Sequence, residues 1–137
     1  MMKIIMLAIL PLSIFAGSFN APMQAYIDGL KMEAKKADSS FVDFDIVRGE
    51  KIFTSSHGGK RGEKISCTSC HMVNLRLKGK HIYTNKIIEP LAPSVNSATL
   101  TVIKDVKKWL RRNFNDVYVR EGTALEQGDV LYYINSK

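Results

Sequence analysis

The most informative stretch of the sequence is Cys67-Thr68-Ser69-Cys70-His71. Its C-x-x-C-H spacing is typical of covalent attachment of a c-type haem. Two thiols three positions apart on one helical turn can each add to a vinyl group of the porphyrin, and the adjoining His71 then meets the iron. We therefore predict one haem c that is held through Cys67 and Cys70, with His71 as the proximal iron ligand.

Two other kinds of site also contain a C-x-x-C pair. A zinc site needs four Cys or His ligands at their own spacing, whereas this chain has no third cysteine, and His57 and His81 do not fit that spacing. A thioredoxin-like redox pair follows a strand in a βαβ pattern, but the residues before Cys67 are rich in Gly and Lys and lack an apolar run. Haem attachment is therefore the preferred interpretation.

The start of the chain has the pattern of a secretory signal peptide. Lys3 supplies a positive charge, residues 4–15 are apolar but too short to span a bilayer, and Ala16-Gly17-Ser18 offers a cleavage site. We predict that residues 1–18 are removed and that residues 19–137 form one haem domain in the periplasm. Export agrees with haem attachment, because covalent haem assembly takes place outside the bacterial cytoplasm.

The mature chain has no disulfide available, because haem attachment uses both of its cysteines. Roughly 120 residues must then be stabilised by one modest core, of which the porphyrin is the largest apolar component. We therefore expect the chain to fold poorly when haem is not attached.

The formal net charge of the chain is +7, and removal of Lys3 lowers it by one. A basic surface outside the cytoplasm favours acidic redox partner proteins or membrane head groups, and it argues against nucleic acid as a partner. We expect a monomer. The basic residues gather near the C-x-x-C-H motif and in one later segment: Lys60, Arg61, Lys64, Arg76, Lys78, Lys80, Lys104, Lys107, Lys108, Arg111 and Arg112.

The apolar spacing predicts an all-α fold with long loops that cover the haem. Residues 21–37 form an amphipathic helix, and a second helix begins at Asp43 or Asp45 and continues through Phe53. Gly49 lies inside that second helix, where glycine costs about 1 kcal/mol relative to alanine. We therefore expect another backbone to cross closely at Gly49.

The later part of the chain predicts two further helices. Residues 99–114 carry the strongest helical pattern, and Thr123 to Glu126 forms a capping box that opens a last helix whose aromatic residues are the expected partners of Gly49. Residues 55–63 and 72–96 are expected to be loops. Within the second loop, the stiff Pro90-Leu91-Ala92-Pro93 stretch can present a backbone carbonyl to the free ring nitrogen of His71.

The ligand on the far side of the iron is less directly indicated. A downstream methionine is excluded, because the only methionine after His71 is Met72, which is tethered to the proximal side. Met23 and Met32 remain formally possible from the N-terminal helix. The other candidates are Asn113, His81, Asn115, a lysine or no protein ligand at all.

Helical phase favours Asn113 over His81. Asn113 is the polar exception on the apolar face of the helix over residues 99–114, and a buried amide without a partner is costly. An asparagine near a helix end can also be a C-terminal cap. His81 would give a closed bis-histidine site, although a histidine in a lysine-rich loop more often lies at the surface.

From Val47 to Lys137 the chain resembles the family of the sphaeroides haem protein (SHP), which are small periplasmic c-type cytochromes. Besides the C-x-x-C-H motif, the matching residues are Arg48-Gly49 with Phe53, the I-E-P-L-A-P-S run of residues 88–94, Lys108-Trp109-Leu110, and Arg112-Asn113 with Asn115. The resemblance implies a small cytochrome c-like domain whose distal ligand is Asn113. It also implies that the asparagine holds oxidised iron and leaves on reduction, so that oxygen or nitric oxide can bind.

The sequence departs from its relatives beside this ligand. An extra cysteine pair known in the family is absent, and Phe114 and about Gly122 occupy the matching places. Trp109, Leu110 and Phe114 are expected to keep water from Asn113, and Arg112 is a candidate for contact with a haem propionate.

The sequence leads to one preferred function and two alternatives. We expect a non-enzymatic protein that accepts electrons and binds a diatomic ligand after reduction, and the resemblance implies a dihaem cytochrome c and a membrane cytochrome b as partners. The first alternative is a plain electron carrier with a bis-histidine site through His81. The second is a small reductase of oxygen, peroxide or a nitrogen oxide, for which the sequence shows no acid-base group beside Asn113.

Overall fold

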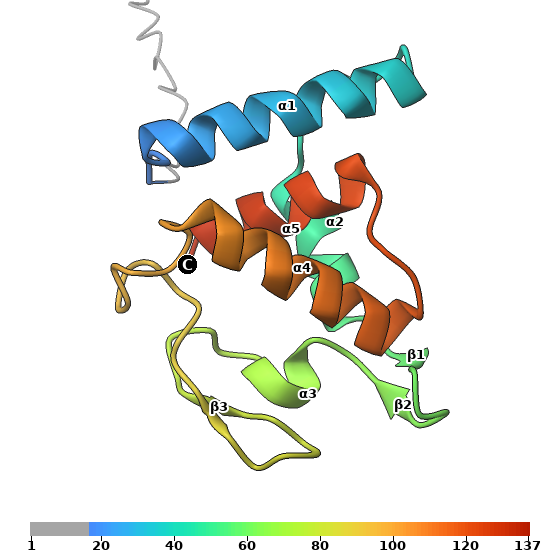
Figure 1. Ribbon diagram of the computed structural model, residues 1–137, viewed down its shortest axis with the longest axis vertical. Helices are drawn as coiled ribbons and strands as arrows, with labels where there is room; N and C mark the ends of the chain where they lie inside the picture. Colours follow the sequence, from blue (N-terminus) through green and yellow to red (C-terminus); the bar gives the residue numbers. More distant parts are fainter. Residues whose placement is uncertain (1–16) are drawn as a thin grey trace, which may run out of the picture.

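A computed structural model describes residues 17–137, so the predicted signal peptide lies almost entirely outside the described residues. The described chain is arranged in three tiers (Figure 1). The upper tier is α1 (Ala21–Ala37), the middle tier holds α2 (Ile46–Thr54), α4 (Ile103–Tyr118) and α5 (Ala124–Asn135), and the lower tier holds α3 (Thr68–His71). Within residues 17–137, no helix is long and apolar enough to cross a membrane.

Two short antiparallel strand pairs flank α3. Strand β1 (His57–Gly58) pairs with β2 (Lys64–Ile65), with His57 opposite Ile65. Strand β3 (Gly79–Lys80) pairs with β4 (Ile87–Ile88), with Gly79 opposite Ile88. The segments predicted as loops are therefore better ordered than expected, because their backbone groups bond to one another.

Side-chain caps fix the starts of two helices. The Asp45 side chain accepts the backbone N–H of Arg48 at 2.7 Å, which starts α2 at Ile46. Thr123 and Glu126 form the predicted capping box at the start of α5, with each side chain accepting the other's backbone N–H. The helix predicted over residues 21–37 is confirmed as α1 with the same bounds.

Helix α4 differs from the predicted range of residues 99–114 by four residues at each end. It begins later because Leu100 has a positive φ of 59°, a backbone conformation that interrupts a right-handed helix. It ends at Tyr118, where Val119 takes a left-handed conformation and donates its N–H to the Asn115 carbonyl at 3.1 Å. Asn113 is therefore inside the helix and is not its C-terminal cap.

Helices α2 and α5 pack at backbone contact through Gly49. A Cβ atom at Gly49 would overlap the carbonyl oxygen of Asp129 and would lie 2.9 Å from the Cβ of Tyr133. Asp129 is 1% exposed, and its carboxylate accepts the Asp45 N–H at 2.7 Å and the Arg48 Nε–H at 2.8 Å. The predicted close crossing at Gly49 is confirmed, and an ion pair locks it.

One apolar core joins the upper and middle tiers. Met23 and Ile27 of α1 are fully buried, and they belong to the same cluster as Leu110 of α4 and Leu131 and Ile134 of α5. Helix α4 is therefore held on one side by α1 and α5, which leaves its other side for the lower tier (Figure 1).

Two glycine substitutions test this packing. Gly49→Ala should lower the free energy of unfolding by about 3 kcal/mol, because the methyl group must push α2 away from the α5 backbone. Gly29→Ala in α1 is the matched control, since nothing lies within 4 Å of a Cβ at that position. This control should gain about 0.5–1 kcal/mol from helix propensity. Urea unfolding followed by circular dichroism measures both, and equal stabilities would contradict the close crossing.

Candidate haem-binding site

The three residues of the C-x-x-C-H motif share one helical turn. The Cys67 carbonyl accepts the N–H of Cys70 at 3.3 Å and the N–H of His71 at 3.1 Å, and both thiols are free. The turn is closed at its start by the Ser66 N–H, which donates to the Ser69 hydroxyl at 3.0 Å. The local geometry therefore presents two thiols and one imidazole from a single rigid turn.

The environment of Cys67 favours a neutral thiol. Burial raises the pKa of Cys67 to about 12, and the nearby Cys70 adds to the effect. A zinc-bound thiolate would need the opposite shift and further ligands. Among residues 17–137, no three His, Cys, Asp or Glu side chains gather closely enough to hold a metal ion by themselves.

His71 is buried and neutral. Burial lowers the pKa of His71 to about 4, an effect that the nearby Asn113 side chain partly opposes. Its ring at pH 7 is therefore the uncharged form that binds metals. Its Nδ1 atom is buried and has no hydrogen-bond partner among the described residues. A buried polar atom without a partner is costly, so the described chain alone does not satisfy the His71 ring.

Neighbouring elements fix the position of His71 from two sides. The Phe53 ring of α2 lies 5.9 Å from the His71 ring and 5.5 Å from the Tyr133 ring of α5. On another side, a Cβ at Gly79 would overlap the Cys70 carbonyl oxygen and would lie 3.0 Å from the His71 Cα. Strand β3 can therefore approach the motif only at a glycine. Gly79 was not among the predicted site residues, and its only signal in the sequence is a glycine between two lysines soon after the motif.

The Pro90-Leu91-Ala92-Pro93 stretch packs beside the motif, but it does not bond to His71 as predicted. The buried Ala92 donates its N–H to the Leu75 carbonyl at 2.9 Å. The Pro90 carbonyl is already taken, because it accepts the Asn96 side-chain amide at 2.8 Å. Within the described chain this segment therefore supports the loop after the motif and leaves the His71 Nδ1 atom unpaired.

Asn113 faces His71 from the opposite element. It lies inside α4, and its side chain is near enough to the His71 ring to affect the pKa of that ring, so the two predicted iron ligands are brought together from α3 and α4. Leu110 lies about one turn before Asn113 and Phe114 directly follows it, and both are buried as expected. Trp109 is 52% exposed, so the expectation that it shields this site is wrong in this structure. Its ring lies instead under the charged groups of Lys108 and Arg112.

The structure places the rival distal ligands in other roles. The Nδ1 atom of His81 accepts the backbone N–H groups of Tyr83 at 3.3 Å and Thr84 at 3.2 Å, so this ring holds the turn between β3 and β4. Met23 is fully buried in the core beneath α1, and Met32 is 75% exposed on the same helix. Position therefore favours Asn113 over each of these residues.

The surroundings of the motif are apolar in a way that suits a porphyrin. Six large apolar side chains in residues 72–95, the segment that follows the motif, are exposed, and a flat apolar group beside the motif needs apolar cover of this kind. They are Met72, Val73, Leu77, Ile82, Ile87 and Val95.

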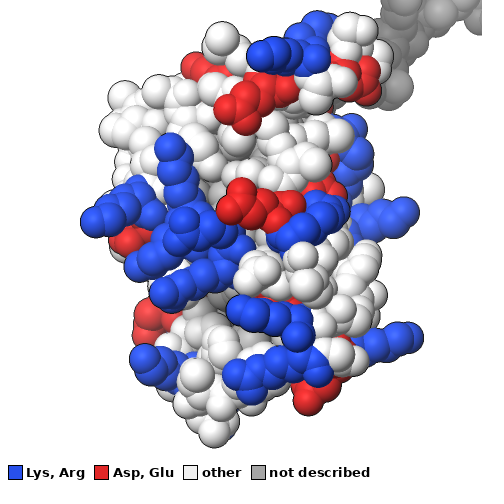
Figure 2. Space-filling view, turned by 45° about the vertical axis from the view of Figure 1, so that its right-hand side comes forward, with Lys and Arg blue, Asp and Glu red and all other residues white. Residues whose placement is uncertain are grey.

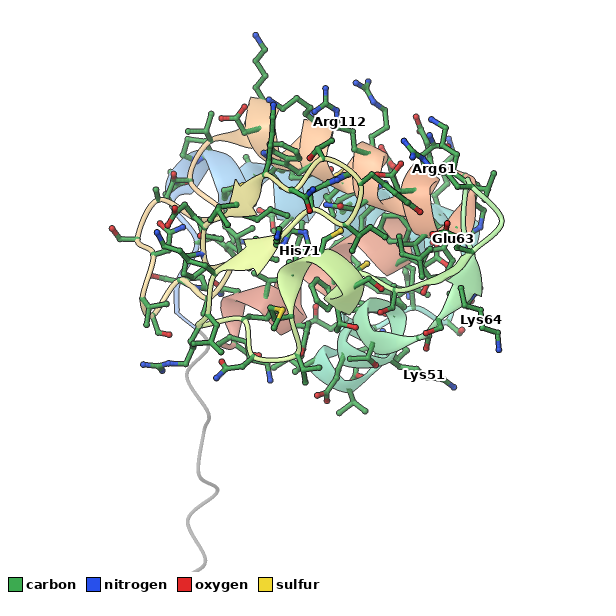
Figure 3. The ribbon with its side chains drawn as sticks, turned by 90° about the horizontal axis from the view of Figure 1, so that it is seen from below. Lys51, Arg61, Glu63, Lys64, His71 and Arg112 are labelled. Carbon is green, nitrogen blue, oxygen red and sulfur yellow. The ribbon has the colours of Figure 1, made fainter. Side chains whose placement is uncertain are left out.

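Charged side chains surround this region on its outer side. Figure 3 shows His71 near the middle of the molecule, with Arg112 and Arg61 beyond it and Lys51 and Lys64 at the outer edge. The Arg61 guanidinium lies 3.9 Å from the Tyr83 ring centre, and the Tyr83 hydroxyl donates to Glu63 at 3.4 Å. These contacts join the loop after β1 to the turn after β3, and they close one side of the site.

The sequence matches known proteins over most of the described region. Residues 39–134 match the family described as "Domain of unknown function (DUF1924)". The cytochrome c-type protein SHP of Cereibacter sphaeroides is 38% identical over 90 residues, which are 66% of this chain and 69% of that protein. Cytochrome c'' of Methylophilus methylotrophus is 30% identical over 101 residues, which are 74% of this chain and 70% of that protein.

Solved structures agree with these matches. Oxidised SHP, described as an oxygen-binding cytochrome c, superposes with a TM-score of 0.74 at 33% identity and covers 88% of this chain and 100% of that chain. Oxidised cytochrome c'' superposes with a TM-score of 0.72 at 27% identity and covers 82% of this chain and 91% of that chain. The predicted small, mostly helical cytochrome c-like fold is confirmed. The chain therefore belongs to the SHP-type family of c-type cytochromes, whose cofactor is haem c.

Proposed function

We propose that this chain is an exported, periplasmic cytochrome with one covalently bound haem, and that it binds a diatomic ligand such as oxygen or nitric oxide after reduction. The observation that carries the proposal is that Asn113 on α4 lies close to His71 on α3. The likeness to an SHP described as an oxygen-binding cytochrome c supports it. So does the likeness to a cytochrome c'' whose solution structure is described in terms of haem-ligand detachment.

The residues of the α3 turn supply the fixed side of the site. When bound, the haem iron exchanges one electron and offers a coordination position to an external ligand. Cys67 and Cys70 would hold the porphyrin through thioether bonds, and the neutral His71 ring would supply a nitrogen to the iron. Phe53 and Gly79 keep that ring and turn in place.

Asn113 supplies the displaceable side. Its amide oxygen is a hard, neutral and weak donor that suits ferric iron better than the softer ferrous ion. Helix α4 is anchored on both sides of Asn113 by the buried Leu110 and Val117. Asn113 could therefore leave the iron by rotation of its side chain while α4 stays in place.

The cysteine pair can be tested by substitution. Cys67→Ala and Cys70→Ala should each reduce the yield of haem-bearing protein and lower its helix content, because the porphyrin forms part of the core. Intact-protein mass spectrometry and circular dichroism measure the two effects. Thr68→Val, within the same turn, is the control and should retain haem. Full haem attachment in both cysteine variants would contradict the proposed linkage.

The distal ligand can be tested with carbon monoxide. The reduced wild-type protein should show an immediate shift of its Soret band, because Asn113 no longer competes for the iron. Asn113→His replaces the amide with a stronger ligand for the iron. If the new histidine occupies the iron nine-tenths of the time, the apparent affinity for carbon monoxide should fall about tenfold. Asn113→Ala should change the spectrum of the oxidised form.

Two control variants separate this proposal from its main rival. Asn115→Ala and His81→Ala should keep the wild-type spectra in both oxidation states. Loss of the oxidised low-spin spectrum in His81→Ala alone would show a bis-histidine electron carrier. Steady-state turnover of oxygen, peroxide or a nitrogen oxide would favour the reductase alternative.

A further inference from the structure

Helix α4 carries a row of positive charge on the side that faces away from Asn113. Five basic residues recur at the spacing of one helix face, and we call them the α4 basic stripe: Lys104, Lys107, Lys108, Arg111 and Arg112. At 1.5 Å per residue the stripe is about 12 Å long. Figure 2 shows blue side chains gathered on the left of the molecule at the height of α4. The stripe is thus a continuous basic surface.

The charges of the stripe are largely unneutralised. Within the described residues, its only ion pair is between Lys108 and Asp105, at 3.4 Å and with both side chains well exposed. Glu33 and Glu121 line the hollows beside Lys107, but neither forms an ion pair with it. An acidic surface of matching length would therefore find free cations.

Aromatic rings hold several of these cations in place. The Lys107 Nζ lies 4.9 Å from the ring centre of Tyr26, and the Lys108 Nζ lies 4.9 Å from that of Trp109. The Arg112 guanidinium lies 5.4 Å from the same Trp109 ring, which is itself 52% exposed. Exposed tryptophan beside arginine is typical of the residues that dominate protein–protein binding. Preordered side chains also lose less entropy on binding.

We propose that the α4 basic stripe is the docking surface for an acidic redox partner protein. An acidic protein is favoured over an anionic membrane, because a membrane-binding helix inserts its apolar face into lipid. The apolar face of α4, with Val106, Leu110 and Phe114, is already buried in the core. Docking here puts the partner across one helix, about 10 Å thick, from Asn113. The proposal rests on the proposed function, because it names the surface through which the electron is accepted.

The test uses the haem-loaded protein and reduced flavodoxin, a strongly acidic flavoprotein, as the electron donor. The triple variant Lys104→Glu, Lys107→Glu and Arg111→Glu reverses the stripe without touching Trp109 or its two stacked cations. The matched control, Lys51→Glu, Lys60→Glu and Lys64→Glu, makes the same change in net charge at three exposed lysines outside α4. Figure 3 shows two of them, Lys51 and Lys64, at the outer edge. The stripe variant should reduce the rate constant at least about tenfold at low salt, because electrostatic steering acts on this scale.

Three readouts make the outcomes decisive. Wild-type reduction should slow as salt rises, and the stripe variant should lose most of this dependence. An equal or larger effect in the control variant, or none in the stripe variant, would overturn the proposal. Stripe-dependent binding to phosphatidylglycerol vesicles with an unchanged flavodoxin rate would also overturn it, in favour of a membrane.

Further controls distinguish a docking defect from a fault at the iron. Reduction by dithionite and the Soret shift with carbon monoxide should be the same in all variants, since neither depends on docking. If the wild-type protein shows no Soret shift with carbon monoxide, the proposed function is refuted. The salt and charge-reversal results would still decide whether the stripe is a docking surface. If the charge-reversed protein fails to fold, glutamine is placed at the same three positions. The rate constant with flavodoxin should again fall, and an unchanged rate constant would again overturn the proposal.

Discussion

The site depends on how closely α2 packs against α5. Gly49 lets the two backbones touch, and the Asp129 carboxylate fixes the contact through Asp45 and Arg48. Phe53, one turn after Gly49, then lies between the rings of Tyr133 and His71. The position of His71 is thus set by a helix pair in the middle tier, through one aromatic side chain.

Helix α4 combines two requirements that small cytochromes must meet together. Asn113 faces His71, while the buried Leu110, Phe114 and Val117 lie between that side and the basic stripe. A ligand on a rigid, well-packed helix can be released by a side-chain rotation, and a partner can bind the same helix without disturbing the core. Under the two proposals, the width of one helix would separate ligand exchange from partner recognition.

Local signals explain which features were predictable from the sequence. Asp45, Thr123 and Glu126 cap helices through their own side chains, so the starts of α2 and α5 could be placed from residue type alone. The start of α4 could not, because the positive φ of Leu100 is imposed by its surroundings and not by its residue type. Gly79 was missed for a similar reason, since its role is seen only when β3 meets the Cys70 backbone. Trp109 was placed wrongly because helical phase alone does not show that cations cover its ring.

The central claim is that the iron lies between His71 and Asn113. A crystal structure of the oxidised, haem-loaded protein tests it most directly, because it shows the atoms bound on both faces of the iron. The account predicts a ring nitrogen of His71 on one face and the side-chain oxygen of Asn113 on the other. An imidazole from His81 or a methionine sulphur in place of Asn113 would contradict it.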